Sequence, residues 1–305
     1  MFRDKLISRL LAVMTLAGLA YADVGCGAAS KTDEAANAPT DTPVEQATFT
    51  ELSCDGPFCI FKATRTKSLT LLARPSTATP FTVTLTELTL DGWTSSAPAP
   101  ISVTSSGVGD ADIALLTRQE SGAGTYKFKF SWLHGKSDSV HDSTAIYRLP
   151  FLNGTSHLVL QGYGGTYSHT GESTNSLDFR MNEGTTIVAA RAGKVIALRE
   201  DLTEGGPNPA LPANYVSVLQ GDGTIARYLH LIQNGATVAV GDSLNAGDPL
   251  GLSGNTGNSS EPHLHFEVYR PVTGAVRETL ATRFTVGEGT GLTLVSGQSY
   301  TAITP

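Results

Sequence analysis

Short runs of alternating apolar and polar residues are the feature that most constrains the fold of this 305-residue chain. Examples are FTVTLTELTL, TYKFKFSWL and HLHFEVYR, and clusters of Gly, Pro, Ser and Asp separate such runs. Alternation with period two places successive side chains on opposite faces of a β-strand. Because no helical stripe of any length appears, the pattern predicts an all-β protein with antiparallel sheets.

The composition supports a folded chain and argues against one class of partner. Hydrophobic residues make up 40% of the chain and charged residues only 16%, which is enough to build a buried core. The formal net charge is -7. Because phosphate binding needs a basic face, we expect no nucleic-acid partner.

The N-terminus has the pattern of an export signal. Basic residues precede the apolar stretch LLAVMTLAGL at residues 10–19, and AYA at residues 20–22 fits a small-x-small cleavage site. We therefore assign residues 1–25 to a signal peptide and expect export to the periplasm, the cell envelope or the exterior. An N-terminal anchor helix that stays attached is the alternative.

Three cysteines fit an exported protein. Cys26 follows the apolar stretch and precedes a polar segment, as does the lipid-modified cysteine of bacterial lipoproteins, so a membrane tether and simple cleavage after Ala22 both stay open. Residues 26–47 are rich in Ala, Thr, Pro and acidic residues and predict a flexible tether. Cys54 and Cys59 in CDGPFC favour a disulfide-closed turn in an oxidising compartment, with two buried thiols as the alternative.

Two β-rich blocks follow the tether. Residues 48–147 have the alternating runs and close turns of a β-sandwich without a compact His, Asp or Cys cluster, so we expect a structural role or a small binding module. Trp93 and Trp132 could be ligand platforms, although aromatic residues of a sandwich usually belong to its core. Residues 148–305 form a second all-β block, which contains five of the seven histidines.

The strand-like segment PHLHFEVYR carries a pair of histidines. In a strand, His263, His265 and Glu267 would share one face, while Leu264 and Phe266 would face a core. Two imidazoles side by side on a rigid strand are a usual way to build a metal or acid/base site. A structural role for the histidine pair is the alternative. Glu267 could orient a metal-binding side chain without binding the metal itself.

A second segment, YSHTGESTNSLDF, adds a histidine and a carboxylate. His169 lies in a loop rich in Gly, Ser and Thr, and Asp178 begins the strand-like LDFRM. With apolar neighbours pointing into a core, Asp178 would point to the open face of the sheet. Zinc commonly takes three protein ligands and leaves a fourth position for water, and nitrogen and oxygen donors suit it. In RYLHL, we expect Tyr228 and His230 to share one strand face, with His230 a candidate acid/base group.

These motifs resemble those of the lysostaphin-type, or LytM-type, zinc metallopeptidases. That family shows a His, a spacer, an Asp at a strand start, a lone His, and then HxH. The same order occurs here in SHTGESTNSLDF, YLHL and PHLHFEV, and SGNTG and EGTTIVAARAGKV are also family-like. The resemblance covers roughly residues 150–285 and implies a compact antiparallel β-sheet metallopeptidase domain.

The resemblance also implies the roles of five residues. His169, Asp178 and His265 would bind Zn²⁺, and His230 and His263 would be the catalytic pair. Zinc lowers the pKa of bound water toward about 7 and polarises a carbonyl. The sequence has no HExxH motif, so a histidine rather than a helix-borne glutamate would act as the general base.

By this resemblance the substrate would be a peptide cross-bridge or stem peptide of bacterial peptidoglycan. One alternative is a non-catalytic relative that binds the wall or activates an amidase, although all five positions are intact. Another is an endopeptidase that acts on Gly-rich protein outside the cell. The sequence predicts neither the bond that is cut nor an oligomeric state.

Overall fold

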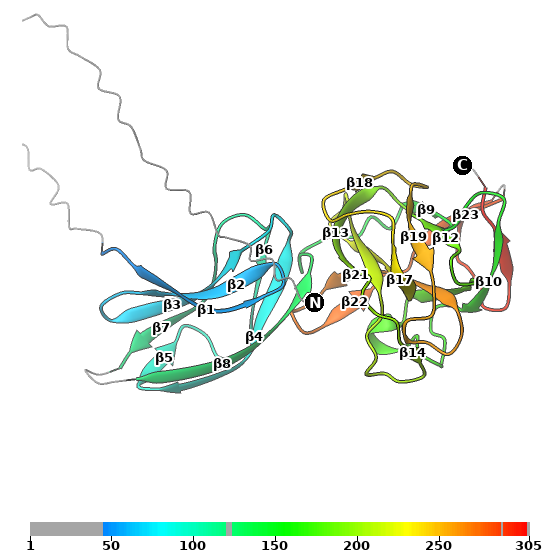
Figure 1. Cartoon of the computed structure of the whole chain (residues 1–305). Helices are drawn as coiled ribbons and strands as arrows, with labels where there is room; N and C mark the ends of the chain where they lie inside the picture. The colour runs from blue at the N-terminus through cyan, green and yellow to red at the C-terminus, as the bar shows by residue number, and fades with distance from the viewer. Residues whose placement is uncertain (1–44, 120–123, 288, 304–305) are drawn as a thin grey trace, which may run out of the picture. The chain divides into compact units, whose positions relative to one another are not determined.

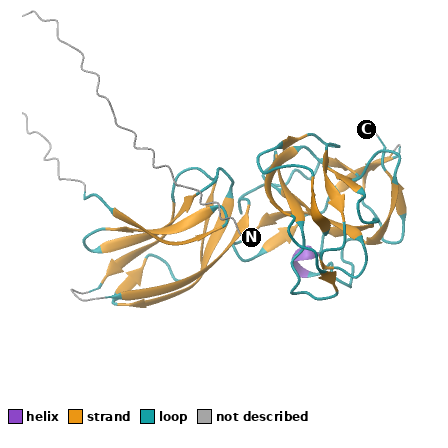
Figure 2. Ribbon diagram, viewed as in Figure 1, coloured by secondary structure: helices purple, strands orange, loops and turns teal. Residues whose placement is uncertain are grey.

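The structure is a computed structural model that describes residues 45–119, 124–287 and 289–303. Regular structure in these residues is almost entirely β-strand, and the only helical segment among them is a 3-10 turn, η1 (Gly171–Ser173). This confirms the predicted all-β class (Figure 2). The predicted signal peptide, Cys26 and most of the predicted tether lie outside the described residues. Within those residues, no helix is long and apolar enough to cross a membrane.

Two antiparallel sheets form the first β region (Figure 1). The larger sheet has five strands, in the order β1 (Thr48–Asp55), β2 (Phe58–Thr64), β3 (Ser68–Pro75), β7 (Ala111–Arg118) and β5 (Trp93–Ser95). The smaller sheet has three, in the order β6 (Ile101–Ser105), β4 (Phe81–Asp91) and β8 (Thr125–His134). Inward-facing residues of both sheets, such as Phe58, Leu71 and Val83, pack into one apolar cluster.

The aromatic residues and cysteines of this region are structural. Trp93 and Trp132 pack against the apolar cluster, and the indole N–H of Trp132 donates to Asp55 over 2.9 Å. Cys54 and Cys59 form a disulfide across the β1–β2 hairpin, as predicted. The boundaries of the tether and of the two β domains stay predictions.

A nine-stranded sheet dominates the second β region. Eight of its strands follow one another in the order β18 (Ser243–Leu244), β13 (Gly193–Arg199), β15 (Tyr215–Gln220), β16 (Ile225–Leu229), β21 (His263–Pro271), β11 (Ser176–Arg180), β10 (Ser156–Gln161) and β25 (Ser299–Thr301). The ninth, β22 (Arg277–Thr279), pairs with β21. One apolar cluster, which includes Tyr147, Val159, Leu264 and Phe266, packs this region together.

Three smaller sheets complete the second region. The first contains β12 (Thr186–Val188), β19 (Pro249–Ser253) and β17 (Leu231–Ala236). The second contains β14 (Gly205–Gly206) and β20 (Gly257–Asn258). The third contains β24 (Gly289–Leu292), β23 (Arg283–Val286) and β9 (Ile146–Arg148). The β14–β20 and β23–β9 pairs are parallel, and the other described pairs are antiparallel. The β14–β20 pair ties two loops together, because Gly205 approaches so closely that a Cβ there would lie 1.7 Å from the carbonyl oxygen of Asn255.

Candidate metal centre

Two adjacent strands present the predicted residues on one face of the large sheet. On β21, Leu264 and Phe266 belong to the apolar cluster, so His263 and His265 project from the opposite face. On β11, Asp178 lies directly opposite His265 in the antiparallel register. The cross-strand pair therefore brings a carboxylate and an imidazole together on a rigid support.

His169 reaches the same place from the loop between β10 and β11. Its backbone N–H donates to the carbonyl of Gly165 over 3.0 Å. Its ring Nδ1 lies 2.9 Å from the carbonyl oxygen of Gly162, to which it donates. These two bonds fold the loop back on itself and leave the imidazole fully buried.

Oδ1 of Asp178 is the atom on which the histidines converge. It lies 2.9 Å from Nδ1 of His265, 3.2 Å from Nε2 of His169 and 3.7 Å from Nε2 of His263. The donor atoms of His169, Asp178 and His265 all lie within 4.8 Å of one another. Two imidazole nitrogens and one carboxylate oxygen are a donor set typical of a zinc site with three protein ligands.

The hydrogen bonds of these histidines show whether a metal fits. Because Nδ1 of His169 donates to Gly162, its buried Nε2 carries a lone pair, which has no hydrogen-bonding partner among the described residues. That lone pair faces a carboxylate oxygen, so the contact is unfavourable unless a cation or a proton lies between the two atoms. Nε2 of His265 lies 3.5 Å from Glu267, and metal-binding histidines commonly donate their second N–H to a carbonyl or carboxylate. The residues present therefore fit zinc.

Burial and charge oppose each other at these groups. Burial alone would raise the pKa of Asp178, but the histidines around it outweigh burial and hold that pKa well below its usual value. Burial alone would lower the pKa of His265, yet Asp178 and Glu267 outweigh it and raise the pKa to about 9. At neutral pH the metal-free chain therefore carries a proton on both nitrogens of His265, and a metal must displace the one on Nδ1.

Glu267 lies behind His265 and is only 1% exposed. Arg227 approaches its carboxylate to 3.3 Å and Arg277 to 3.5 Å. Although burial alone would raise the pKa of Glu267, His265 and these two arginines lower it. The carboxylate is therefore ionised and lies where it can orient the ring of His265, which is the role that the sequence suggested.

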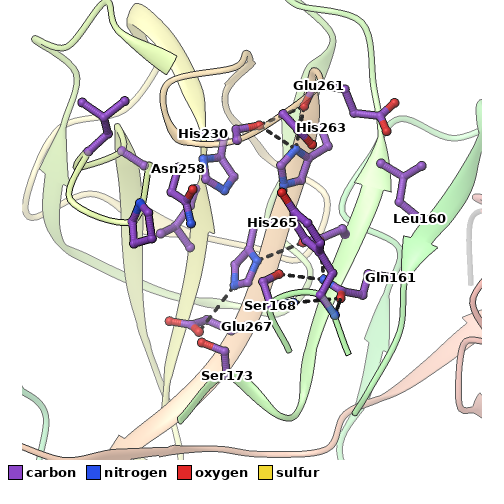
Figure 3. Close-up of a pocket in the computed structure, with 18 of the residues that line it drawn as sticks. Leu160, Gln161, Ser168, Ser173, His230, Asn258, Glu261, His263, His265 and Glu267 are labelled. Atoms are coloured by element: carbon purple, nitrogen blue, oxygen red, sulfur yellow. Dashed lines mark hydrogen bonds and ion pairs between the residues drawn. The ribbon is translucent and has the colours of Figure 1, made fainter. Parts of the chain in front are cut away.

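His230 and His263 lie side by side next to the ligand set, with ring centroids 4.5 Å apart (Figure 3). Nδ1 of His230 donates to the carbonyl of Thr256 over 2.6 Å, and Nδ1 of His263 donates to the carbonyl of Glu261 over 2.8 Å. Burial lowers the pKa of His230 to about 3 and also lowers the pKa of His263. Both rings are therefore neutral at neutral pH, with Nε2 able to accept a proton.

The backbone at His230 corrects one prediction from the sequence. Tyr228 does not share a face with His230, because Tyr228 packs into the apolar cluster while His230 and Leu229 line the cavity. The cause is the left-handed conformation of His230, whose φ is 67° and which separates β16 from β17. For a non-glycine residue this conformation costs about 1–2 kcal/mol and tends to occur at functional sites.

A cavity of about 690 Å³ opens over these groups. Asp178, His230, His263 and His265 line it, whereas His169 lies beneath them and is 0% exposed. The volume lies within the usual range for a ligand site. Tyr167 also lines the cavity and is 76% exposed, so its ring is accessible to a substrate.

The sequence did not single out two polar residues that support the site. Gln161 ends β10 and lies 3.1 Å from Oδ2 of Asp178. Asn214 precedes β15, is fully buried, and hydrogen-bonds with its side chain to the backbone beside His230. The only signal in the sequence is a polar residue at the end of an apolar run, and many structural residues share it.

Comparison with known proteins places part of the chain in a family. The model of peptidase family M23 matches residues 172–277. The matched segment contains Asp178, His230, His263 and His265, and it begins three residues after His169.

Several relatives align with part of the chain. Peptidoglycan DD-endopeptidase ShyA of Vibrio cholerae is 37% identical over 101 residues, which are 32% of this chain and 21% of ShyA. Lysostaphin of Staphylococcus simulans is 36% identical over 111 residues, which are 35% of this chain and 21% of lysostaphin. A metalloprotease of Buchnera aphidicola is 28% identical over 162 residues, which are 52% of this chain and 39% of that protein. The chain thus spans well under half the length of each of these relatives.

Among solved structures, the catalytic domain of lysostaphin is 27% identical, with a TM-score of 0.29, and the match covers 41% of this chain and 87% of that domain. The prediction of a lysostaphin-type domain is confirmed by the family match together with these relatives. Residues 172–277 of this chain are a domain of peptidase family M23.

Proposed function

We propose that this protein is an exported, zinc-dependent endopeptidase that hydrolyses peptide bonds of peptidoglycan. The observation that carries the proposal is the convergence of His169 and His265 on one oxygen of Asp178, beside two neutral histidines in an open cavity. A metal site alone would fit a structural zinc. The adjacent pair His230 and His263 adds the groups that hydrolysis needs.

Each group has a chemical task in this proposal. His169, Asp178 and His265 would hold zinc, which supplies acidification of a water molecule and polarisation of the scissile carbonyl. His230 and His263 each present Nε2 as a proton acceptor, because their Nδ1 atoms donate to backbone carbonyls. One of them can take a proton from the attacking water, and the protonated ring can stabilise the oxyanion or protonate the leaving amine.

The substrate class rests on the relatives and on the N-terminal sequence. One relative is named a peptidoglycan DD-endopeptidase and another a glycyl-glycine endopeptidase. The signal pattern at residues 1–25 would bring this chain to the compartment that holds the cell wall. A lipid on Cys26 would tether the enzyme to a membrane beside that polymer.

Digestion of purified sacculi tests the proposal. The full chain is incubated with sacculi with and without a zinc chelator, and the released fragments are analysed by mass. We expect peptide fragments that appear only without chelator and identify the bond that is cut. Bound zinc with no turnover of any sacculus would contradict the proposal and support a wall-binding role. Activity on Gly-rich protein but not on sacculi would replace the proposed substrate.

A further inference from the structure

Gln161 lies next to both segments that carry proposed ligands. One is β11, which carries Asp178, and the other is the loop between β10 and β11, which carries His169. Gln161 is the last residue of β10 and pairs with Asp178 across the β10–β11 register. Its side chain is 9% exposed. In Figure 3 the labelled Gln161 and Ser168 lie near each other, below His263 and beside His265 in this view.

The backbone fixes the orientation of the Gln161 amide. Its Oε1 accepts the backbone N–H of Tyr167 over 3.0 Å and that of Ser168 over 3.1 Å. A carbonyl oxygen is the only end of an amide that can accept from two N–H groups. The NH₂ group must therefore face the other way, where Nε2 donates to Oδ2 of Asp178 over 3.1 Å and to Oγ of Ser168 over 2.7 Å.

In this orientation the two carboxylate oxygens of Asp178 have different partners. Oδ2 accepts from Gln161, while Oδ1 faces the ring nitrogens of His169 and His265. An anchored Oδ2 keeps the carboxylate from rotating and reserves Oδ1 for a cation. Hydrogen bonds of this kind to a ligating carboxylate typically matter by 10–100-fold in metal affinity.

Gln161 also shapes the loop that delivers His169. Its Oε1 binds the two backbone N–H groups immediately before that residue. The loop passes so close that a Cβ at Gly165 would lie 2.2 Å from Cγ of Gln161. Since His169 donates its own N–H to the carbonyl of Gly165, the position of the imidazole depends on how the loop wraps Gln161.

We propose that Gln161 is a positioning residue of the metal centre, which holds Asp178 as a single-oxygen ligand and sets the loop that carries His169. The inference rests on the proposed zinc site and extends it to a residue outside the ligand set. Gln161 acts through its neighbours and takes no part in proton transfer.

The substitution Gln161→Glu separates this role from simple support of the loop. A glutamate keeps an oxygen for the N–H groups of Tyr167 and Ser168, but it loses the donor to Asp178 and places a second negative charge beside it. The zinc affinity of the purified full chain is measured by competition with a chromophoric chelator over about pH 7 to 9, because burial beside Asp178 raises the pKa of the introduced carboxyl and only its ionised form lacks the donor. We expect affinity to fall about 10–100-fold.

Gln220→Glu is the matched control. Gln220 is also buried in the large sheet, and its Oε1 accepts from the hydroxyls of Tyr147 and Thr224. It ends β15 at the opposite end from Tyr215, the residue that lies in register with Leu229 and His265. We expect its zinc affinity to equal that of the wild type. The melting temperature of each metal-free variant shows how much of any effect is general destabilisation. Where Gln161→Glu does not fold, Gln161→Met removes the donor to Asp178 and the acceptor for Tyr167 and Ser168 without adding charge, and at least the same weakening is expected.

The outcomes separate this inference from the proposed function. Wild-type zinc affinity in Gln161→Glu or Gln161→Met overturns the positioning role, because the loss of the donor to Asp178 then has no consequence. Equal weakening in Gln161→Glu and Gln220→Glu also overturns it. A wild-type chain that binds no zinc at all refutes the proposed function itself, before any variant is compared.

Discussion

At the residue scale, the four histidines in and beneath the cavity share one arrangement. Three of them, His169, His230 and His263, donate Nδ1–H to a backbone carbonyl, and His265 has its Nε2 beside the buried carboxylate of Glu267. Each ring therefore has one nitrogen held by the protein and the other directed to the shared site. The backbone selects the tautomers of His169, His230 and His263 in advance, so these three rings need little reorganisation when metal or substrate binds.

Alanine substitution of the proposed catalytic pair should separate chemistry from metal binding. We expect His230→Ala and His263→Ala each to lower kcat by at least about 100-fold, because each removes a group that transfers a proton. Zinc content should stay close to one ion per chain, since neither residue belongs to the ligand set. Metal analysis and initial rates on soluble peptide fragments measure the two effects. Full activity in either variant would show that the substituted histidine does not have the proposed catalytic role.

At the scale of single elements, alternation predicted strands well where one face is buried. On β21 the pattern placed His263 and His265 opposite Leu264 and Phe266, as the structure shows. It gave the wrong face at Tyr228, because a left-handed residue interrupts the strand and alternation assumes a continuous extended backbone. A single departure in φ thus reversed a prediction that the local pattern otherwise supported.

The loops were harder to predict than the strands. The path that brings His169 to Asp178 depends on bonds to Gln161, Gly162 and Gly165, which act across the loop and across a strand pair. No periodicity in the sequence encodes such contacts. The resemblance to a family supplied the candidate residue, and the structure supplied the physical reason for its position.

Asn214 gives a test at the element scale. Its side chain accepts from the N–H of Leu202 and donates to the carbonyls of Leu202, Leu231 and Ile232, and its backbone N–H donates to Thr256. The carbonyl of Thr256 in turn holds the ring of His230. Asn214→Ala leaves several buried polar groups without partners, which should lower the free energy of unfolding by about 1–3 kcal/mol.

The same substitution should also impair the proposed catalytic pair. We expect Asn214→Ala to lower kcat more than zinc affinity, because the support of His230 is lost while the ligand set is untouched. Urea denaturation measures the first effect, and rates together with chelator competition measure the second. Asn245→Ala, at an exposed position, is the control and should change the stability by less than about 0.5 kcal/mol. Unchanged kcat in Asn214→Ala would show that Thr256 holds His230 without its help.

At the scale of the whole molecule, metal binding should be visible as stability. A ligand that binds only the folded chain stabilises it by about 2.7 kcal/mol at a hundredfold excess over the dissociation constant. For a chain of this size we expect zinc to raise the melting temperature by about 5–10 °C, and a chelator to reverse the shift. Calorimetry or fluorescence melting of the full chain measures it.

The ligand variants are the control for this shift. Asp178→Ala and His265→Ala should show neither a zinc-dependent rise in melting temperature nor retained zinc after dialysis. His157→Ala, which alters a histidine of β10 bonded to the carbonyl of Arg180, should keep both. A zinc-dependent rise in Asp178→Ala equal to that of the wild type would mean that the metal binds elsewhere.

The pairing of β11 with β21 has a consequence for how the proposed metal site assembles. Asp178 and His265 are partners across adjacent strands, yet 87 positions of sequence separate them. While the chain is being synthesised, the first two proposed ligands exist without the third until almost all of the M23 domain has been made. The chain must lose the conformational entropy of this long loop before the contact between Asp178 and His265 can stabilise it. We therefore expect metal capture at the proposed site to be a late event, because an unfinished chain lacks one of the three proposed ligands.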